Sequence, residues 1–206
     1  MTDEAIRTIA DIWDQSRRRR GKLSYRNLLR IAINSGLFFL CHRSPEFASL
    51  PIVKGRWPQI HNGGVIKFGK RCVFQHGRVR SSMCAWSNAT LDVGDHAFFN
   101  EGVDICASKH IKIGHHVKVG GNVYIYDTDF HRVCPDLPTS QAPVTIGNNV
   151  WIGTRAIILA GAEIGNHSVI GAGAVVTGKI PACCVAAGNP ARVLRTFEAP
   201  ADWVRG

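Results

Sequence analysis

The chain has 206 residues, of which 45% are hydrophobic and 19% charged, a composition typical of one folded domain with an appendage and not of a disordered chain. Its 25 basic and 15 acidic residues give a formal charge of +10, which favours anionic partners: nucleic acid, acidic lipid, phosphorylated sugars or an anionic cofactor. The seven cysteines include no C-x2-C pair. This argues against a disulfide framework and a zinc knot, and for a reducing, cytoplasmic location.

We expect residues 1–55 to form a basic, helical segment ahead of the main domain. Apolar residues recur at helical spacing at Ile6, Ile9, Ala10 and Trp13, and Ser24 is a candidate N-cap for a second helix. The acidic start of the chain is unlike a secretory signal. The apolar stretch inside the second helix is too short to cross a membrane.

A run of arginines, 17–20, followed by Lys22 separates the two expected helices. One interpretation is a solvated turn between helices that cover the open end of the next domain, where exposed strand edges would otherwise aggregate. The other is a peripheral anchor on an anionic membrane. The sequence leaves both interpretations open.

A branched aliphatic residue recurs at every sixth position in the second half of the chain. Neither a helix nor a simple alternating strand has this period, which instead indicates one short strand and one turn per unit. The residue four positions after each aliphatic is mostly small, which suits a narrow interior. The residue directly after four of the aliphatics is glycine, which suits tight corners. The pattern predicts an all-β fold, a parallel β-helix in which each unit forms one side of a prism. The six aliphatics are Ile146, Ile152, Ile158, Ile164, Ile170 and Val176.

The same period extends upstream with shifts in phase, through residues 93–105 and 113–125. It breaks at about residues 126–145, a segment rich in Pro, Asp, Thr and Ser, which we expect to be a loop expelled from the β-helix. We therefore expect the β-helix domain to span residues 56–197 and a tail to span 198–206.

Three motifs, IGNNVWIG, IGNHSVIGAGAVVT and AAGNPARVLR, resemble those of the hexapeptide-repeat acyltransferases. The resemblance covers about residues 60–195 and is strongest to sugar and polysaccharide O-acetyltransferases of the maltose, galactoside and colanic-acid type. It implies a left-handed β-helix and a homotrimer, with acetyl-CoA in the groove between neighbouring prisms. The implied reaction is direct acetyl transfer to a hydroxyl of a sugar or polysaccharide precursor, without a metal or nucleic acid.

The resemblance also implies a catalytic residue. His131, in the expelled loop, matches the family's general base, and imidazole suits proton abstraction near neutral pH. Asp129 is a candidate to orient the imidazole or to bind a sugar hydroxyl, although closing a turn would explain it equally well. Asn100 matches an asparagine that binds the acceptor or the base. Cys134 lies near His131, but the family pattern needs no cysteine nucleophile.

The resemblance implies eight candidate cofactor-binding residues, six of which match positions that line acetyl-CoA in the family. Backbone groups near Gly153 and Ala172 would bind the pantetheine amides, and the two C-terminal arginines would face the phosphates. The family often has a lysine directly after the threonine, whereas here Gly178 intervenes. The eight residues are Trp151, Gly153, Thr154, Ala172, Thr177, Lys179, Arg192 and Arg195.

Two other classes of function need to be weighed. The γ-class carbonic anhydrases share the prism and bind zinc through three histidines, two of them five residues apart, as His110 and His115 are, with His76 as the third. The register places His110 at a corner, which argues against a tetrahedral site. A basic nucleic-acid-binding or scaffold protein is the second alternative, but the positive charge is spread along the chain instead of forming a stripe.

Overall fold

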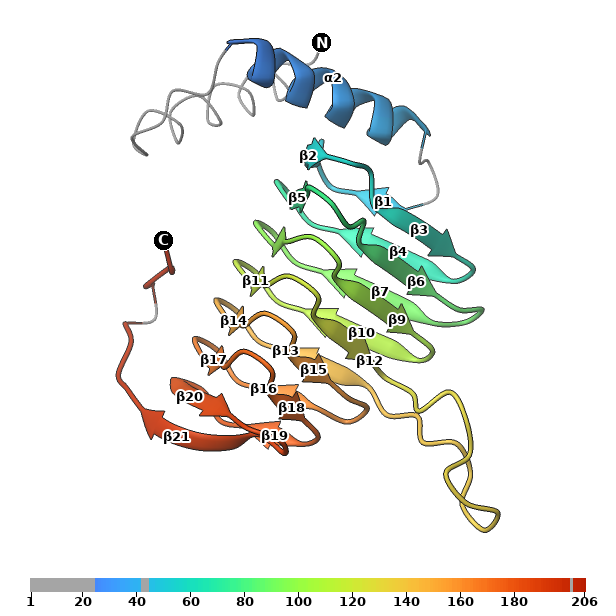
Figure 1. Ribbon diagram of the computed structural model, residues 1–206, viewed down its shortest axis with the longest axis vertical. Helices are drawn as coiled ribbons and strands as arrows, with labels where there is room; N and C mark the ends of the chain where they lie inside the picture. The colour runs from blue at the N-terminus through green and yellow to red at the C-terminus, as the bar shows by residue number, and fades with distance from the viewer. Residues whose placement is uncertain (1–24, 42–44, 201) are drawn as a thin grey trace.

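The computed structural model describes residues 25–41, 45–200 and 202–206 (Figure 1). The amphipathic pattern at residues 6–13, the arginine run and the expected cap at Ser24 lie outside the described residues. In the described part, one helix, α2 (Tyr25–Cys41), precedes a column of short strands. Within these ranges no helix combines the length and the apolar character needed to cross a bilayer.

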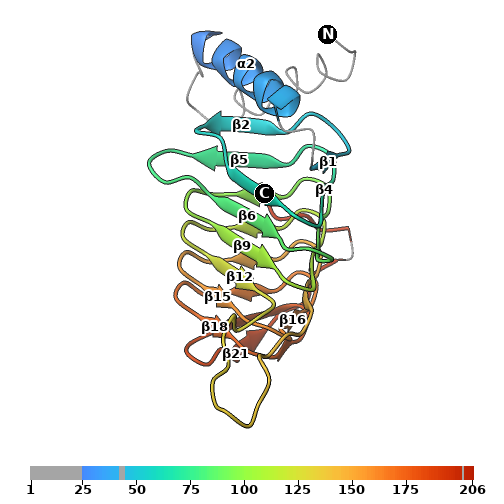
Figure 2. The same cartoon turned by 90° about the vertical axis from the view of Figure 1, so that its right-hand side faces the viewer.

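The strands form three sheets that make the three sides of a prism (Figures 1 and 2). Sheet A contains β1 (Glu46–Phe47), β4 (Val65–Phe68), β7 (Thr90–Val93), β10 (His110–Ile113), β13 (Val144–Ile146), β16 (Glu163–Ile164) and β19 (Lys179–Ile180). Sheet B contains β2 (Ile52–Gly55), β5 (Val73–His76), β8 (Phe98–Phe99), β11 (Lys118–Val119), β14 (Trp151–Ile152), β17 (Val169–Ile170), β20 (Cys184–Ala187) and β21 (Arg192–Thr196). Sheet C contains β3 (Gln59–Asn62), β6 (Ser82–Ala85), β9 (Asp104–Ala107), β12 (Tyr124–Tyr126), β15 (Ile157–Ile158) and β18 (Val175–Val176).

The six-residue period becomes three ladders of buried side chains. Each coil of the chain passes through sheets A, B and C in turn, so residues eighteen apart pair in parallel register: Ile146 with Ile164, and Ile152 with Ile170. All six periodic aliphatics are buried, as are the small residues four positions later, such as Ser168. The predicted β-helix is confirmed.

The corners between sheets A and B explain the asparagines and histidines of the repeat motifs. Asn149 and His167 have positive φ values of 55° and 63°, a conformation that asparagine and histidine adopt more readily than most residues. The backbone N–H of Asn148 donates to Oδ1 of Asn166 in the next coil at 2.8 Å. Stacked polar side chains therefore join successive coils at this corner.

The upper coils, from β1 to β12, have longer turns and a bulkier interior than the lower ones. Phe68, Phe74 and Phe99 are buried there, and their ring centroids lie 5.4 and 5.5 Å apart. Turns of unequal length shift the phase of the repeat, so the sequence pattern is weak in this region. The first strands, β1 and β2, precede residue 56, where we expected the β-helix to begin.

Helix α2 covers the open end of the first coil. Its Ser35 hydroxyl accepts a hydrogen bond from the N–H of Val53 in β2 at 2.9 Å, and Nδ2 of Asn34 donates to the carbonyls of Val53 and Gly55 at 3.3 and 2.7 Å. Phe38 is fully buried against the interior. The helix side chains thus satisfy backbone groups at the edge of sheet B, which supports the capping interpretation for α2.

The other end of the prism is closed by β21, which folds back antiparallel on β20. The chain then returns along the A–B corner, where Nδ2 of Asn149 donates to the carbonyl of Trp203 at 2.9 Å and the N–H of Arg205 donates to Oδ1 of Asn149 at 2.8 Å. Residues 202–206 are therefore attached to the coils.

Candidate active site

The expelled loop, residues 127–143, leaves the prism at the corner between sheets C and A and projects beyond the coils (Figure 1). Its first residue, Asp127, is fully buried. The carboxylate of Asp127 accepts hydrogen bonds from the backbone N–H groups of Ser108, Lys109 and His110 at 2.6, 2.8 and 2.7 Å. Bonds from N–H donors to a buried carboxylate are strong, so Asp127 ties the loop to the preceding coil.

The base of the loop is further ordered by backbone contacts. Thr128 and Gln141 form an antiparallel bridge, and the Thr128 hydroxyl accepts a hydrogen bond from the N–H of Phe130 at 3.1 Å. The N–H of His131 donates to the carbonyl of Asp129 at 2.7 Å, and both residues are exposed. The structure thus places the two predicted loop residues together, close to the anchored base of the loop.

Phe130, which directly precedes His131, packs against aromatic side chains on the outer surface of sheet C. The ring of Phe130 is 5.7 Å from that of Trp86 and 5.2 Å from that of Tyr126, and the Tyr126 hydroxyl donates to the carboxylate of Asp104 at 2.9 Å. Burial, together with this hydrogen bond, raises the pKa of Tyr126 above its ordinary value, so the phenol stays protonated. Phe130 and Trp86 are exposed. They form an apolar surface bordered by polar groups.

A second set of predicted residues lines the corner between sheets B and C. Asn100, Gly153 and Ala172 occupy this corner, with the coil of Gly120 between those of Asn100 and Gly153, and the Asn100 side-chain oxygen accepts from the N–H of Glu101 at 2.8 Å. A side chain at Gly153 would approach the backbone nitrogen of Ala172 to 2.6 Å, so glycine is needed for the coils to stack. Thr154 and Ala172 are exposed on this corner.

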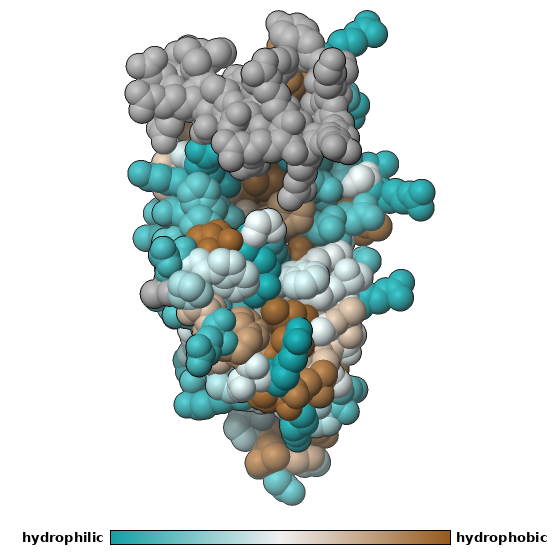
Figure 3. Space-filling model, turned by 90° about the vertical axis from the view of Figure 1, so that its left-hand side faces the viewer, coloured by the Kyte–Doolittle hydropathy of each residue, from teal (hydrophilic) through white to brown (hydrophobic). Residues whose placement is uncertain are grey.

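The predicted tryptophan and arginines follow the outer surface of sheet B toward the same end of the prism. Trp151 pairs with Val169, Val169 with Val185, and Val185 with Arg195, so these outward-facing side chains form one row. Arg192 pairs with the last residue of β20, next to the B–C corner. Trp151 is 47% exposed and both arginines are exposed. Figure 3 shows this side of the molecule, with apolar side chains gathered on its lower part.

The two remaining predicted cofactor residues lie elsewhere. Thr177 is exposed at the C–A corner, on the side from which the expelled loop leaves. Lys179 begins β19 on sheet A, where its ammonium group pairs with the carboxylate of Glu163 at 3.1 Å. Within one chain, the structure therefore does not bring Lys179 together with Trp151 or Thr154.

The candidate residues of one chain fall at opposite edges of sheet C. The loop with His131 leaves from the C–A edge, whereas Asn100, Thr154 and Ala172 line the B–C edge. A site that needs both sets is incomplete in a single prism.

The three histidines considered as zinc ligands do not converge. His76 is buried in sheet B with its Nδ1 2.9 Å from the carbonyl of Arg56, His110 lies on the outer face of sheet A, and His115 lies at the A–B corner beside Asp95. Among residues 25–41, 45–200 and 202–206, no group of three or more His, Cys, Asp or Glu side chains is arranged to hold a metal ion. The geometry does not support the carbonic anhydrase interpretation.

Coils built of three six-residue units, with one anchored loop that bears a histidine, define a β-helical protein with a candidate active site, and comparisons with known proteins identify its family. The family model described as bacterial transferase hexapeptide (six repeats) matches residues 143–178. The putative lipopolysaccharide biosynthesis O-acetyl transferase WbbJ of Escherichia coli K12 is 31% identical over 151 residues, covering 68% of this chain and 76% of that protein. The chain therefore belongs to the hexapeptide-repeat acetyltransferase family.

Other relatives match over shorter stretches. The galactoside O-acetyltransferase of Escherichia coli K12 is 38% identical over 113 residues, which cover 53% of this chain and 56% of that protein. Like other relatives of this kind, it is thus matched over only about half of its length. A hexapeptide-repeat acetyltransferase from Vibrio cholerae, solved with acetyl coenzyme A, shares the fold with a TM-score of 0.51 and 22% identity, over 95% of this chain and 86% of that one.

Two features of the site escaped the sequence analysis. Asp127 directly follows a buried strand and opens the expelled loop, a position where aspartate often binds backbone N–H groups, and this signal was available in the sequence. Trp86 meets Phe130 only because strands more than forty residues apart in sequence lie close together in sheet C. No local pattern could have revealed that contact.

Proposed function

We propose that the protein is an acetyl-CoA-dependent O-acetyltransferase that acts on a hydroxyl of a sugar or polysaccharide precursor. The observation that carries this proposal is the anchored loop, in which His131 directly follows Phe130 and so comes next in sequence to the aromatic surface of Phe130 and Trp86. Relatives named for galactoside and lipopolysaccharide acetylation support this class of acceptor. Aromatic rings bordered by polar groups, as at Trp86 and Phe130, suit a sugar that has both apolar faces and hydroxyls.

In the proposed reaction, the imidazole of His131 removes the proton from the acceptor hydroxyl. The oxygen then attacks the thioester carbonyl carbon, and a backbone N–H stabilises the oxyanion of the tetrahedral intermediate. The intermediate collapses as the carbon–sulfur bond breaks, and the CoA sulfur takes the proton from the imidazolium. A positioned base of this kind contributes about 10²–10⁴-fold to the rate.

Acetyl-CoA fits the groups at the B–C corner and on the outer surface of sheet B. Arg192 and Arg195 present exposed cations for the phosphates, and guanidinium groups bind phosphate through paired hydrogen bonds. Trp151, Thr154 and Ala172 are exposed on the way from these arginines toward the middle of the prism. The position of Lys179 on sheet A instead favours a contact contributed from another chain, or a purely structural ion pair with Glu163.

We infer that the active assembly is a homotrimer. The loop that bears His131 and the corner that bears Thr154 and Ala172 lie at opposite edges of sheet C. A binding site normally encloses most of its ligand, and the exposed corner of one prism offers only one wall. In a closed ring of three copies, the loop of one chain would face the corner of the next, giving three equivalent sites.

A cytoplasmic location completes the proposal. Six cysteines in the described ranges are free thiols, which is typical of a reducing compartment. The basic segment at residues 1–50 suggested contact with the inner face of a membrane. This segment is a different part of the molecule from the candidate active site.

The test is to supply acetyl-CoA with a panel of sugar nucleotides and glycans and to follow the release of the CoA thiol. We expect release with at least one sugar acceptor, and His131→Ala should lower turnover at least about 10²-fold while acetyl-CoA binding is kept. His115→Ala is the matched control, since His115 is exposed at the A–B corner, away from the C–A edge from which the loop leaves. Turnover of His131→Ala within a few-fold of the wild type would overturn the assignment.

A further inference from the structure

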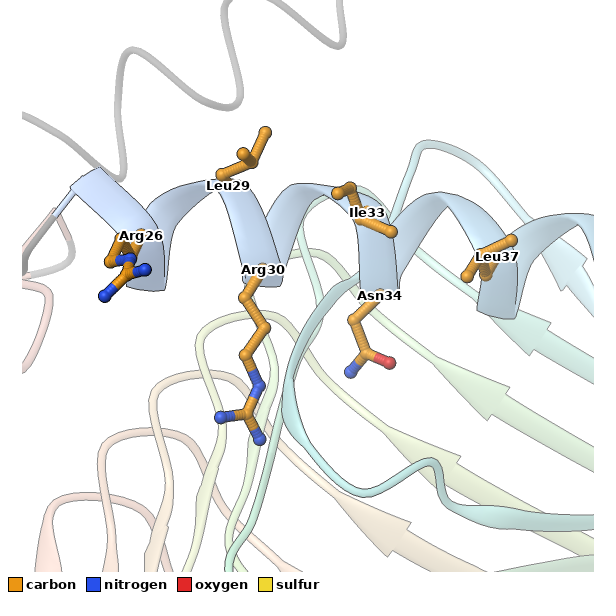
Figure 4. Close-up of a pocket in the computed structure, with 6 residues that line it drawn as sticks. All are labelled: Arg26, Leu29, Arg30, Ile33, Asn34 and Leu37. Atoms are coloured by element: carbon orange, nitrogen blue, oxygen red, sulfur yellow. The ribbon is translucent and has the colours of Figure 1, made fainter.

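The outer face of α2 carries a row of exposed apolar side chains. They are spaced by four, four and three residues, so they lie along one face of the helix. Figure 4 shows Leu29 and Ile33 projecting away from the coils. We call this row the α2 stripe: Leu29 (49% exposed), Ile33 (54%), Leu37 (49%) and Leu40 (65%).

Capping of the β-helix does not explain the α2 stripe. The side chains that contact the first coil include Ser35, Asn34, Phe38 and Phe39, and Leu28 is also buried. They lie on the inner face of the helix. An isolated exposed leucine needs no explanation, but four large aliphatics in one row on a helix mark an interaction surface.

Positive charge borders the α2 stripe. Arg26 and Arg30 are exposed and, with three stripe residues, line a shallow depression of about 400 Å³ on the helix. In Figure 4, Arg30 extends from the helix on a different side from Leu29 and Ile33. The sequence from residue 15 to residue 45 contains eight basic and no acidic residues. A partner that covers the α2 stripe lies close to these positively charged residues. The positive charge therefore favours a partner with an anionic surface.

We propose that the outer face of α2 docks on an anionic phospholipid membrane. The α2 stripe would enter the boundary between headgroups and acyl chains, and Arg26 and Arg30 would lie at the lipid phosphates. An apolar face bordered by basic residues is the pattern of helices that lie in the membrane interface. Basic residues close to such a helix add electrostatic attraction to acidic headgroups.

The position of α2 makes this docking compatible with the proposed chemistry. The helix covers the first coil, whereas the expelled loop leaves the prism between β12 and β13 and extends away from the helix, toward the other end (Figure 1). A membrane at the α2 end would therefore leave the loop and the aromatic surface beside it open to an acceptor. The docking itself does not depend on acetyl transfer.

The experiment measures co-sedimentation of the full chain with vesicles of phosphatidylcholine alone and of phosphatidylcholine with about 30% phosphatidylglycerol. We expect at least tenfold tighter binding to the anionic vesicles, weakened by added salt because the attraction is partly electrostatic. Ile33→Ser with Leu37→Ser should reduce binding to the anionic vesicles at least tenfold. Val79→Ser with Leu194→Ser, which changes two exposed aliphatics elsewhere, should leave it unchanged.

A second variant distinguishes a loss of membrane binding from a loss of folding. Arg26→Gln with Arg30→Gln leaves the apolar row intact and should still weaken binding to the anionic vesicles and reduce its salt dependence. Equal binding of the wild type to both vesicle types, no binding to either, or equal losses in the Ile33/Leu37 and Val79/Leu194 variants would overturn the proposal. So would a light-scattering result in which the Ile33/Leu37 variant loses a self-association of the wild type, since a second copy would then cover the stripe.

Discussion

The lower coils, from β13 to β20, and the upper coils, from β1 to β12, are built on the same three-sided plan with different interiors. The lower interior contains mainly isoleucine, valine and alanine, and its turns keep the six-residue period. The upper interior contains Phe68, Phe74 and Phe99, and its turns vary in length. The residues beside the expelled loop, such as Trp86 and Asp104, come from the upper coils. Irregular coils thus supply the aromatic surface beside Phe130, whereas the regular coils contain most of the residues that we propose to bind acetyl-CoA.

The strictness of the six-residue period in the sequence therefore reflects how uniform the interior of the coils is. A strict repeat requires every coil to have the same size, and only small and branched side chains meet that condition here. Where aromatic rings fill the prism, the corners lengthen and the repeat weakens.

The largest expected effect is on stability in the two interiors. Phe74→Ala should lower the free energy of unfolding by about 3–5 kcal/mol, because a fully buried ring is replaced by a cavity between two other phenylalanines. Ile152→Ala in the lower coils should cost about 2–5 kcal/mol, toward the lower end, because the neighbouring aliphatics are smaller. Urea unfolding of both variants checks the order. An equal or larger cost for Ile152→Ala would show that the two interiors do not differ in this way.

The next effect concerns the anchor of the loop. Asp127→Asn replaces one oxygen that accepts backbone hydrogen bonds with an NH₂ group, and should lower kcat more than tenfold by misplacing His131. The KM for acetyl-CoA should change little, because Arg192 and Arg195, the proposed phosphate-binding residues, lie at the far end of sheet B. Asp136→Asn, an exposed change in the same loop, is the control. Steady-state kinetics that show equal losses in kcat for both variants would contradict the anchoring role.

A smaller effect is expected at the cofactor end of the lower coils. Arg192→Ala combined with Arg195→Ala should raise the KM for acetyl-CoA more than tenfold, since charge-assisted bonds to phosphate commonly contribute about 1.5–3 kcal/mol. The rise should be larger at low salt, with little change in the KM for the acceptor. Lys179→Ala serves as the comparison, because its ion pair with Glu163 is exposed and should contribute little. A fall in acceptor affinity with unchanged acetyl-CoA affinity would place the cofactor elsewhere.

The sequence predicted the lower coils almost residue by residue and the site only in part. The positions in the sheets of the six aliphatics from Ile146 to Val176 could be predicted, because burial repeats with a fixed period in this part of the chain. The loop was visible as a break in that period. Contacts between distant coils, such as Phe130 with Trp86, depend on how many residues each upper turn contains, and no local pattern encodes that number. The edge of the prism at which each candidate residue lies also became clear only from the strand register.

The smallest effect is a pH dependence set in the upper coils. Burial lowers the pKa of His76 below its ordinary value of 6.5, so the folded state resists a proton that the unfolded state accepts. The contribution of neutral His76 to the free energy of unfolding should be fully present above about pH 6.5. It should fall as the pH drops below this value, by at most about 1.4 kcal/mol per pH unit for one group. His76→Asn should reduce this fall in urea unfolding between pH 7 and pH 5, whereas the exposed His61→Asn should not. An unchanged slope in His76→Asn would exclude His76 as the source.

Mixed trimers test most directly whether the His131 loop of one chain and the proposed cofactor-binding corner of another chain form one site. Chains with His131→Ala and chains with Arg192→Ala plus Arg195→Ala are co-expressed with different tags, purified as mixed assemblies, and assayed at low acetyl-CoA concentration. Each variant alone should be nearly inactive. The purified mixed trimers should recover about a third of wild-type activity, because in every trimer that contains both variants one of the three interfaces pairs an intact loop with an intact corner. Purified mixed assemblies that remain as inactive as the separate variants would contradict the claim.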